Sequence, residues 1–204
     1  MDHDSRAAFF DGTAEHYDED PTFHAAVADA LVAPLPEGPE LVLDVATGTG
    51  FAAYAALRLK PARVLAVDLS PAMLAKAEAK APELDPSGLI SWRVAPAVPM
   101  PAEDHSADVV LCASSLHFLG AEAFPDWLRV LRPGGRLAFS VVSGARFKPS
   151  GEFAPFVPRD LDFPHDEAGA AALAKDFVDV SAKTFTVDDG DRVRSVFVVH
   201  ATAP

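Results

Sequence analysis

The sequence has a single cysteine, Cys112, among its 204 residues. One cysteine cannot form an intrachain disulfide or a cysteine-based zinc site, and no metal ion is expected. No run approaches the roughly eighteen apolar residues of a membrane span. The opening residues, MDHDSRAAFF, also lack the apolar core of a signal peptide. These absences predict a cytoplasmic protein without a membrane partner.

Positive charge is also scarce. The chain has 17 Lys and Arg against 30 Asp and Glu, a formal net charge of −13. Such a chain repels a phosphate backbone, so nucleic acid is a poor candidate substrate. The alternative explanation of the negative charge is that it only keeps the protein soluble. Half of the residues are apolar, which is enough to cover a buried sheet with helices.

Short apolar runs alternate with helical patterns along most of the chain, and this alternation predicts an α/β fold with a doubly wound, largely parallel sheet. Strands are expected at 41–46, 63–68, 89–94, 107–113 and 136–142, and helices at 24–32, 51–59, 72–81, 123–131 and 168–176. The runs 177–187 and 192–202, split by a turn at 188–191, predict a terminal antiparallel hairpin.

The length predicts one domain over residues 1–204. Within it, residues 1–36 form an N-terminal arm or cap, and 40–142 form the core. Residues 143–166 are rich in proline, glycine and aromatic residues without periodicity, and a loop of that length is usually functional. Residues 167–204 contain the last helix and the hairpin.

A glycine-containing turn, Asp44-Val45-Ala46-Thr47-Gly48-Thr49-Gly50, ends the first strand. Its glycines allow backbone amides to approach a ligand, although ordinary strand-to-helix turns also contain glycine. Asp68 ends the second strand, 18 residues beyond Gly50, where a carboxylate can accept hydrogen bonds from ribose hydroxyls. Together they predict a nucleoside-binding edge of the sheet.

Three segments, LDVATGTG, VDLSPAMLAKAEAKA and VLRPGGRL, occur in order within residues 40–142. In them the sequence resembles the class I S-adenosylmethionine-dependent methyltransferases, in particular the small-molecule group that includes the ubiquinone and menaquinone C-methyltransferases. Ala46 stands where the family most often has its first glycine. The resemblance implies a Rossmann-like seven-stranded sheet with an antiparallel last strand.

The resemblance also assigns roles by position. Gly48 and Gly50, with Ala46, are expected to line the methionine and ribose part of S-adenosyl-L-methionine, and Asp44 to lie near its amino group. Asp68 is expected to hold the ribose and Leu69 to pack on adenine. The family usually has an acid after the third strand to accept from the adenine amino group. This sequence has Pro96 and Ala97 there, which leaves backbone atoms, water or Glu103 to recognise adenine.

Ser114 to Phe118 follow the fourth strand, where the family places groups facing the methyl and the acceptor. His117 is the candidate general base, since an ordinary histidine pKa near 6.5 suits proton removal at neutral pH. A packing role is the alternative. In the arm, Tyr17 with Asp18 resembles an aromatic-acid pair that covers the cofactor, where a ring face would favour the sulfonium cation.

Four aromatic residues of the long loop are candidates for an apolar lid over a small-molecule acceptor, or for satellite core packing: Phe147, Phe153, Phe156 and Phe163. Two other functions stay open. One is an S-adenosylmethionine-binding protein that does not methylate. The other is an NAD(P)-dependent oxidoreductase, which the incomplete G-x-G-x-x-G spacing disfavours. A monomer or a homodimer is expected.

Overall fold

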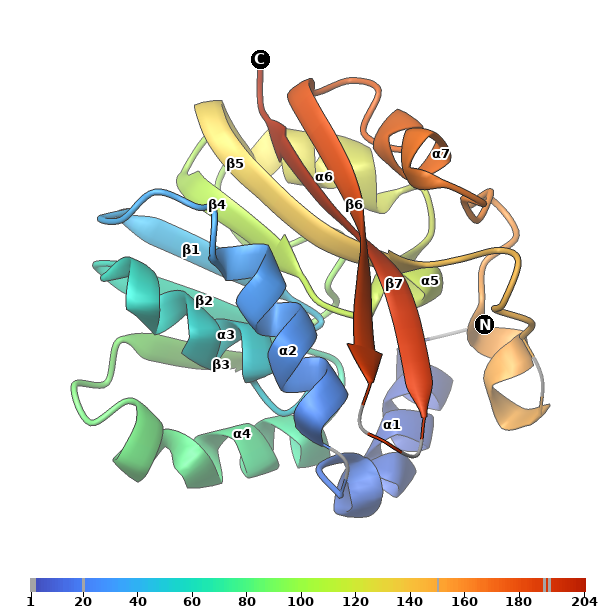
Figure 1. The fold of residues 1–204 in the computed structure, drawn as a ribbon. Helices are drawn as coiled ribbons and strands as arrows, with labels where there is room; N and C mark the ends of the chain where they lie inside the picture. The colour runs from blue at the N-terminus through green and yellow to red at the C-terminus, as the bar shows by residue number, and fades with distance from the viewer. Residues whose placement is uncertain (1–2, 20, 150, 189, 191) are drawn as a thin grey trace.

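The computed structural model describes residues 3–19, 21–149, 151–188, 190 and 192–204. Its sheet has seven strands in the order β3-β2-β1-β4-β5-β7-β6 (Figure 1). The strands are β1 (Leu41–Val45), β2 (Arg63–Asp68), β3 (Ile90–Val94), β4 (Ala107–Cys112), β5 (Leu131–Val142), β6 (Val178–Asp188) and β7 (Val193–Thr202). β1 to β5 pair in parallel, and β7 pairs antiparallel with β5 and β6. The predicted fold class is confirmed.

The helices are α1 (His3–Tyr17), α2 (Pro21–Val32), α3 (Phe51–Ala56), α4 (Pro71–Leu84), α5 (Leu116–Leu119), α6 (Ala123–Val130) and α7 (Glu167–Ala172), with 3-10 turns η1 (Leu57–Leu59) and η2 (Gly151–Phe156). The helix expected at 51–59 tightens into η1 at Leu57. Helices α1 and α5 were not expected. In the hairpin turn, Asp189 and Asp191 lie outside the described residues.

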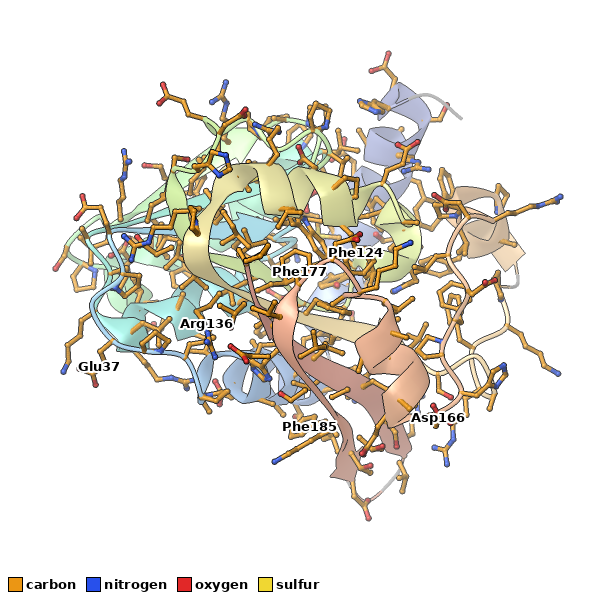
Figure 2. The ribbon with its side chains drawn as sticks, turned by 90° about the horizontal axis from the view of Figure 1, so that it is seen from above. Glu37, Phe124, Arg136, Asp166, Phe177 and Phe185 are labelled. Atoms are coloured by element: carbon orange, nitrogen blue, oxygen red, sulfur yellow. The ribbon has the colours of Figure 1, made fainter. Side chains whose placement is uncertain are left out.

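Two apolar cores lie on opposite faces of the sheet. Val42, Val64 and Val109 face α2 and α3, whereas Leu43, Val110 and Phe139 face α5 and α6. Alternate residues of one strand face opposite sides of the sheet, and both sides are covered, which explains why β1 and β4 are buried throughout and mostly apolar. Figure 2 shows Phe124 and Phe177 on the α6 side and Phe185 on the side of α2.

The order of the strands reverses between β1 and β4, which are neighbours in the sheet. In open α/β sheets, ligands bind at such a point, beyond the carboxyl ends of the strands. The segments that follow β1, β2 and β4 meet there, and α1 and the segment after β5 lie nearby (Figure 1). Among the described residues, no helix is long and apolar enough to cross a membrane.

Candidate functional site

The loop after β1 has three residues in the left-handed region, Ala46 (φ 53°), Gly48 (φ 55°) and Gly50 (φ 89°). Gly48 faces the arm, since a Cβ there would lie 3.9 Å from the Tyr17 ring. Gly50 instead supports packing: a Cβ there would lie 2.8 Å from the Trp92 ring. Ala46 and Gly48 of this loop line the cavity, with Gly48 next to Tyr17.

Asp68 closes this loop from the end of β2. Its Oδ2 accepts the Gly48 N–H at 2.8 Å and its Oδ1 accepts the Ser70 N–H at 2.9 Å. Burial raises the pKa of the Asp68 carboxyl, and these backbone hydrogen bonds act in the opposite direction. The carboxyl lies on the cavity wall with both oxygens already oriented by backbone donors.

Asp44 lies behind the loop. It is buried, its Oδ2 accepts the Thr47 hydroxyl at 2.5 Å, and its Oδ1 lacks a hydrogen-bond partner in the part of the chain that the structure describes. Burial raises its pKa to about 7. Asp44 and Gly50 do not line the cavity. Any contact between Asp44 and a ligand therefore requires water or a shift of the loop.

The side expected to receive adenine is apolar. Leu69, Pro96 and Ala97 all line the cavity, together with Val98. Glu103, the alternative partner suggested for adenine, is exposed and is not on the cavity wall. Polar recognition on this side consequently falls to backbone atoms or water.

Arg129 anchors the segment beyond Ala97. Its Nη2 donates to the Met100 carbonyl and its Nη1 to the Ala102 carbonyl, both at 2.9 Å. It also pairs with Asp126, whose Oδ2 accepts the Met100 N–H at 2.6 Å. The turn behind the apolar wall is thus held to α6.

The end of β4 turns sharply at Ser114, which has φ 58°. Its N–H donates to Ser140 Oγ at 2.8 Å, and its own Oγ is buried without a partner among the described residues. Ser114 and Ser140 both line the cavity. A buried hydroxyl without a partner costs free energy, so a polar ligand atom here would be favourable.

His117 lies on α5 between two aromatic rings. Its ring centroid is 4.0 Å from that of Phe118 and 5.0 Å from that of Phe147. Burial lowers the His117 pKa to about 4, so the expectation of an ordinary pKa near 6.5 is wrong. The side chain lines the cavity as a neutral imidazole, and its buried Nδ1 has no partner within the described ranges.

Helix α1 is held over the cavity by polar contacts at three levels. Arg6 Nη1 donates to the Phe118 carbonyl at 3.1 Å. Asp11 Oδ1 accepts the Ser70 hydroxyl at 2.5 Å. Asp18 accepts the Thr49 hydroxyl at 2.6 Å and pairs with Lys80 at 3.0 Å. The arm therefore reaches from α5 to α4.

Tyr17 ends α1 over the glycine loop. Its ring stacks on His24 with centroids 5.2 Å apart, and burial raises its hydroxyl pKa to about 12. The ring lines the cavity and is uncharged at neutral pH. This placement fits a cover over the nucleoside position.

The segment 143–166 lies against the same cavity. Gly144 N–H donates to the Pro164 carbonyl at 2.8 Å, which closes the segment at its base. Phe147 and Phe153 line the cavity, whereas Phe156 contacts Phe9 and Phe163 contacts Phe147 outside the lining. Two of the four expected lid residues therefore face the cavity and two pack behind them.

One cavity of about 880 Å³ is lined by residues from α1, α5, the loop after β1, the ends of β2 and β4 and the segment after β5. Nine of the expected site residues line it: Tyr17, Ala46, Gly48, Asp68, Leu69, Pro96, Ala97, Ser114 and His117. Sequence reasoning missed several others, among them Arg6, Phe10, Ser140, Arg146 and Arg194. These residues carry no local motif, since they reach the cavity from distant elements.

Residues 43–139 match the model of a methyltransferase domain family. The chain belongs to the class I S-adenosylmethionine-dependent methyltransferases. S-adenosylmethionine is the cofactor of this family. Three groups of this methyltransferase fold fit the cofactor: the Asp68 carboxylate, the half-buried Gly48 backbone, and the Ser114 hydroxyl, which has no partner among the described residues.

Two curated relatives illustrate the similarity. An arsenite methyltransferase of Halobacterium salinarum is 33% identical over 178 residues, covering 80% of this chain and 45% of that protein. A ubiquinone/menaquinone biosynthesis C-methyltransferase of Dinoroseobacter shibae is 35% identical over 120 residues, covering 56% of this chain and 47% of that protein. The chain spans about half the length of these relatives.

Among solved structures, a Haloferax volcanii methyltransferase in complex with the Trm112 methyltransferase activator aligns with a TM-score of 0.73 at 20% identity. The alignment covers 96% of this chain and 97% of that one. At this identity the similarity establishes the fold alone.

Proposed function

We propose that this chain transfers a methyl group from S-adenosylmethionine to a small-molecule acceptor by in-line displacement. The observation that carries the proposal is the single cavity, which joins the wall formed by Gly48 and Asp68 to the aromatic wall around His117. Its volume lies in the upper part of the range of about 300–1,000 Å³ typical of small-molecule sites. A cavity of this size supports the binding of the cofactor and a small acceptor next to each other.

In this proposal Asp68 accepts hydrogen bonds from the ribose, Leu69 and Pro96 enclose adenine, and Tyr17 covers the loop. The cofactor supplies a methyl carbon on a cationic sulfur, and the acceptor lone pair bonds to that carbon as the carbon–sulfur bond breaks. The protein has to align the acceptor and exclude water. Helix α1 and residues 143–166 enclose the cavity and exclude water.

His117 receives the proton that the acceptor loses, in this proposal. Its pKa of about 4 makes it a weak base toward a resting hydroxyl. An oxygen that has just gained a methyl group while keeping its proton is a far stronger acid than a protonated His117 side chain, so a neutral imidazole can still take the proton. The partnerless Nδ1 is the position for this transfer.

Two measurements test the proposal. Titration calorimetry with S-adenosylhomocysteine should show binding, and NADH should not bind. Methyl-labelled S-adenosylmethionine should then label the small-molecule fraction of a cell extract in the presence of the protein. Label only in the protein or nucleic acid fraction would refute a small acceptor, and binding without any transfer would favour the non-methylating alternative.

A further inference from the structure

The outer part of the cavity is built from flat rings that contact one another. Phe118 lies 5.3 Å from Phe10 and 6.2 Å from Phe153, and His117 lies 5.0 Å from Phe147, measured between ring centroids. All five rings line the cavity. They come from α1, α5 and the segment after β5. Such a wall favours a planar apolar molecule, because aromatic rings gain from offset or edge contacts.

Positive charge is also present in the cavity lining, where the Arg194 guanidinium lies over the Phe23 ring, 4.5 Å from its centroid. Arg6, Arg146 and Arg194 line the cavity from α1, the segment after β5 and β7. The described acids of the lining are Asp68, Asp160 and Glu122. Asp68 and Asp160 already accept backbone N–H groups, and Glu122 is exposed. In a chain of net charge −13, three arginines that line one cavity are a local concentration of positive charge.

Arg146 is an exposed arginine of the cavity lining. Within the described residues its guanidinium has no hydrogen bond, ion pair or ring contact, whereas Arg129 and Arg136 have fixed partners. Arg6 donates to the Phe118 carbonyl, but its buried Nε lacks an acceptor in the same part of the chain. Guanidinium donors without partners, next to flat rings, suit a carboxylate attached to an aromatic ring.

The geometry points to an aromatic carboxylate as the acceptor class, with the ring against the aromatic wall that Phe10, Phe118 and Phe153 form and the carboxylate on Arg146. This inference rests on the proposed function, because it names the acceptor of the same cavity. Arg146 is then a specificity residue. It also borders a second hollow of about 570 Å³ through Ser143 and Ser195, which gives a larger acceptor room to extend past the guanidinium.

The test uses 1-hydroxy-2-naphthoate and its neutral counterpart 1-hydroxy-2-naphthamide, titrated into the full chain saturated with S-adenosylhomocysteine. The naphthoate should bind about tenfold more tightly than the amide, as expected for one hydrogen-bonded charge. Arg146→Gln should abolish this preference and Arg146→Lys should retain part of it. Lys148→Gln is the matched control, since Lys148 is exposed in the same segment and is not on the cavity wall. It should keep the full preference.

Saturation with S-adenosylhomocysteine separates the two proposals. Failure of the cofactor product to bind would refute the proposed function. If it binds but the two naphthalenes bind equally, or neither binds, the aromatic carboxylate class is wrong while the proposed function stands. A preference that Arg146→Gln leaves intact would remove Arg146 from recognition.

Discussion

The backbone N–H of Gly48 donates a 2.8 Å hydrogen bond to Asp68 Oδ2, which ties the glycine loop after β1 to the end of β2. One carboxylate therefore shapes the loop and faces the cavity. Asp68→Ala removes both functions. We expect calorimetry to show at least about tenfold weaker binding of S-adenosylmethionine, because one charged hydrogen bond is lost.

Glu103→Ala provides the control for that experiment, because Glu103 is an exposed acid outside the cavity. Its affinity should match the unmodified chain. If the folded Asp68→Ala variant, checked by circular dichroism, bound S-adenosylmethionine as tightly as the unmodified chain, the assignment of Asp68 to the ribose would be contradicted.

Gly50→Ala should destabilise the fold, because a Cβ there lies 2.8 Å from the Trp92 ring and the backbone has φ 89°. Gly38→Ala isolates the backbone contribution, since Gly38 has φ 78° and open space around it. We expect about 1 kcal/mol for Gly38→Ala and about 2–4 kcal/mol for Gly50→Ala. Urea unfolding measures both, and equal losses would mean that Trp92 accommodates the methyl group.

Ala46→Gly should stabilise the fold by about 1 kcal/mol, because φ 53° strains alanine and not glycine. Ala53→Gly in α3 is the opposite control, since a buried helical alanine should lose about 1 kcal/mol or more on the same change. The midpoints of urea unfolding of the Ala46→Gly and Ala53→Gly variants, compared with that of the unmodified chain, measure both effects. A less stable Ala46→Gly variant would show that the methyl group of Ala46 packs usefully.

His117→Ala should lower kcat by about 10²-fold while S-adenosylmethionine affinity stays nearly unchanged, since the residue acts at the proton and not at the cofactor. With a pKa of about 4, its protonation should not produce a step in kcat near pH 6.5. Steady-state rates across pH check both points. A variant that keeps most of its turnover would make His117 a packing residue.

Stability should also depend on pH through His117. Its pKa is 6.5 in the unfolded chain and about 4 when folded, so between these values only the unfolded chain binds this proton. The stabilising contribution is therefore complete above about pH 6.5 and falls toward pH 4. Burial shifts the pKa of Asp44 in the opposite direction, upward, and this affects both proteins. The measurement is therefore the difference in unfolding free energy between the unmodified chain and His117→Gln. In urea unfolding, the variant should gain relative stability at about pH 5 compared with about pH 7.5.

Local signals in the sequence predicted the parts of the structure that local physics determines. Ser70 caps α4 and accepts the Met73 N–H at 3.0 Å, a contact that depends only on residues three apart. Helix α1 could not be predicted in the same way. Ala14 is its only buried residue among those described, and its contacts, such as Asp11 with Ser70, join residues 59 positions apart.

The same distinction holds at the site. Asp68 and Gly48 follow strand ends that the sequence marks, so their meeting was predictable. The shift in the His117 pKa depends on burial beside Phe147, thirty residues later, and the convergence of Arg146 and Arg194 depends on the antiparallel pairing of β5 with β7. No local pattern contains these relationships.

Helix α1 and the residue after it cover both binding positions: Asp18 contacts the glycine loop and Arg6 contacts α5. A cofactor and an acceptor bound there would share this cover. In the proposed reaction, the spent cofactor and the methylated product leave during the same opening of α1. The frequency of that opening then sets a ceiling on turnover, however fast the methyl transfer itself becomes.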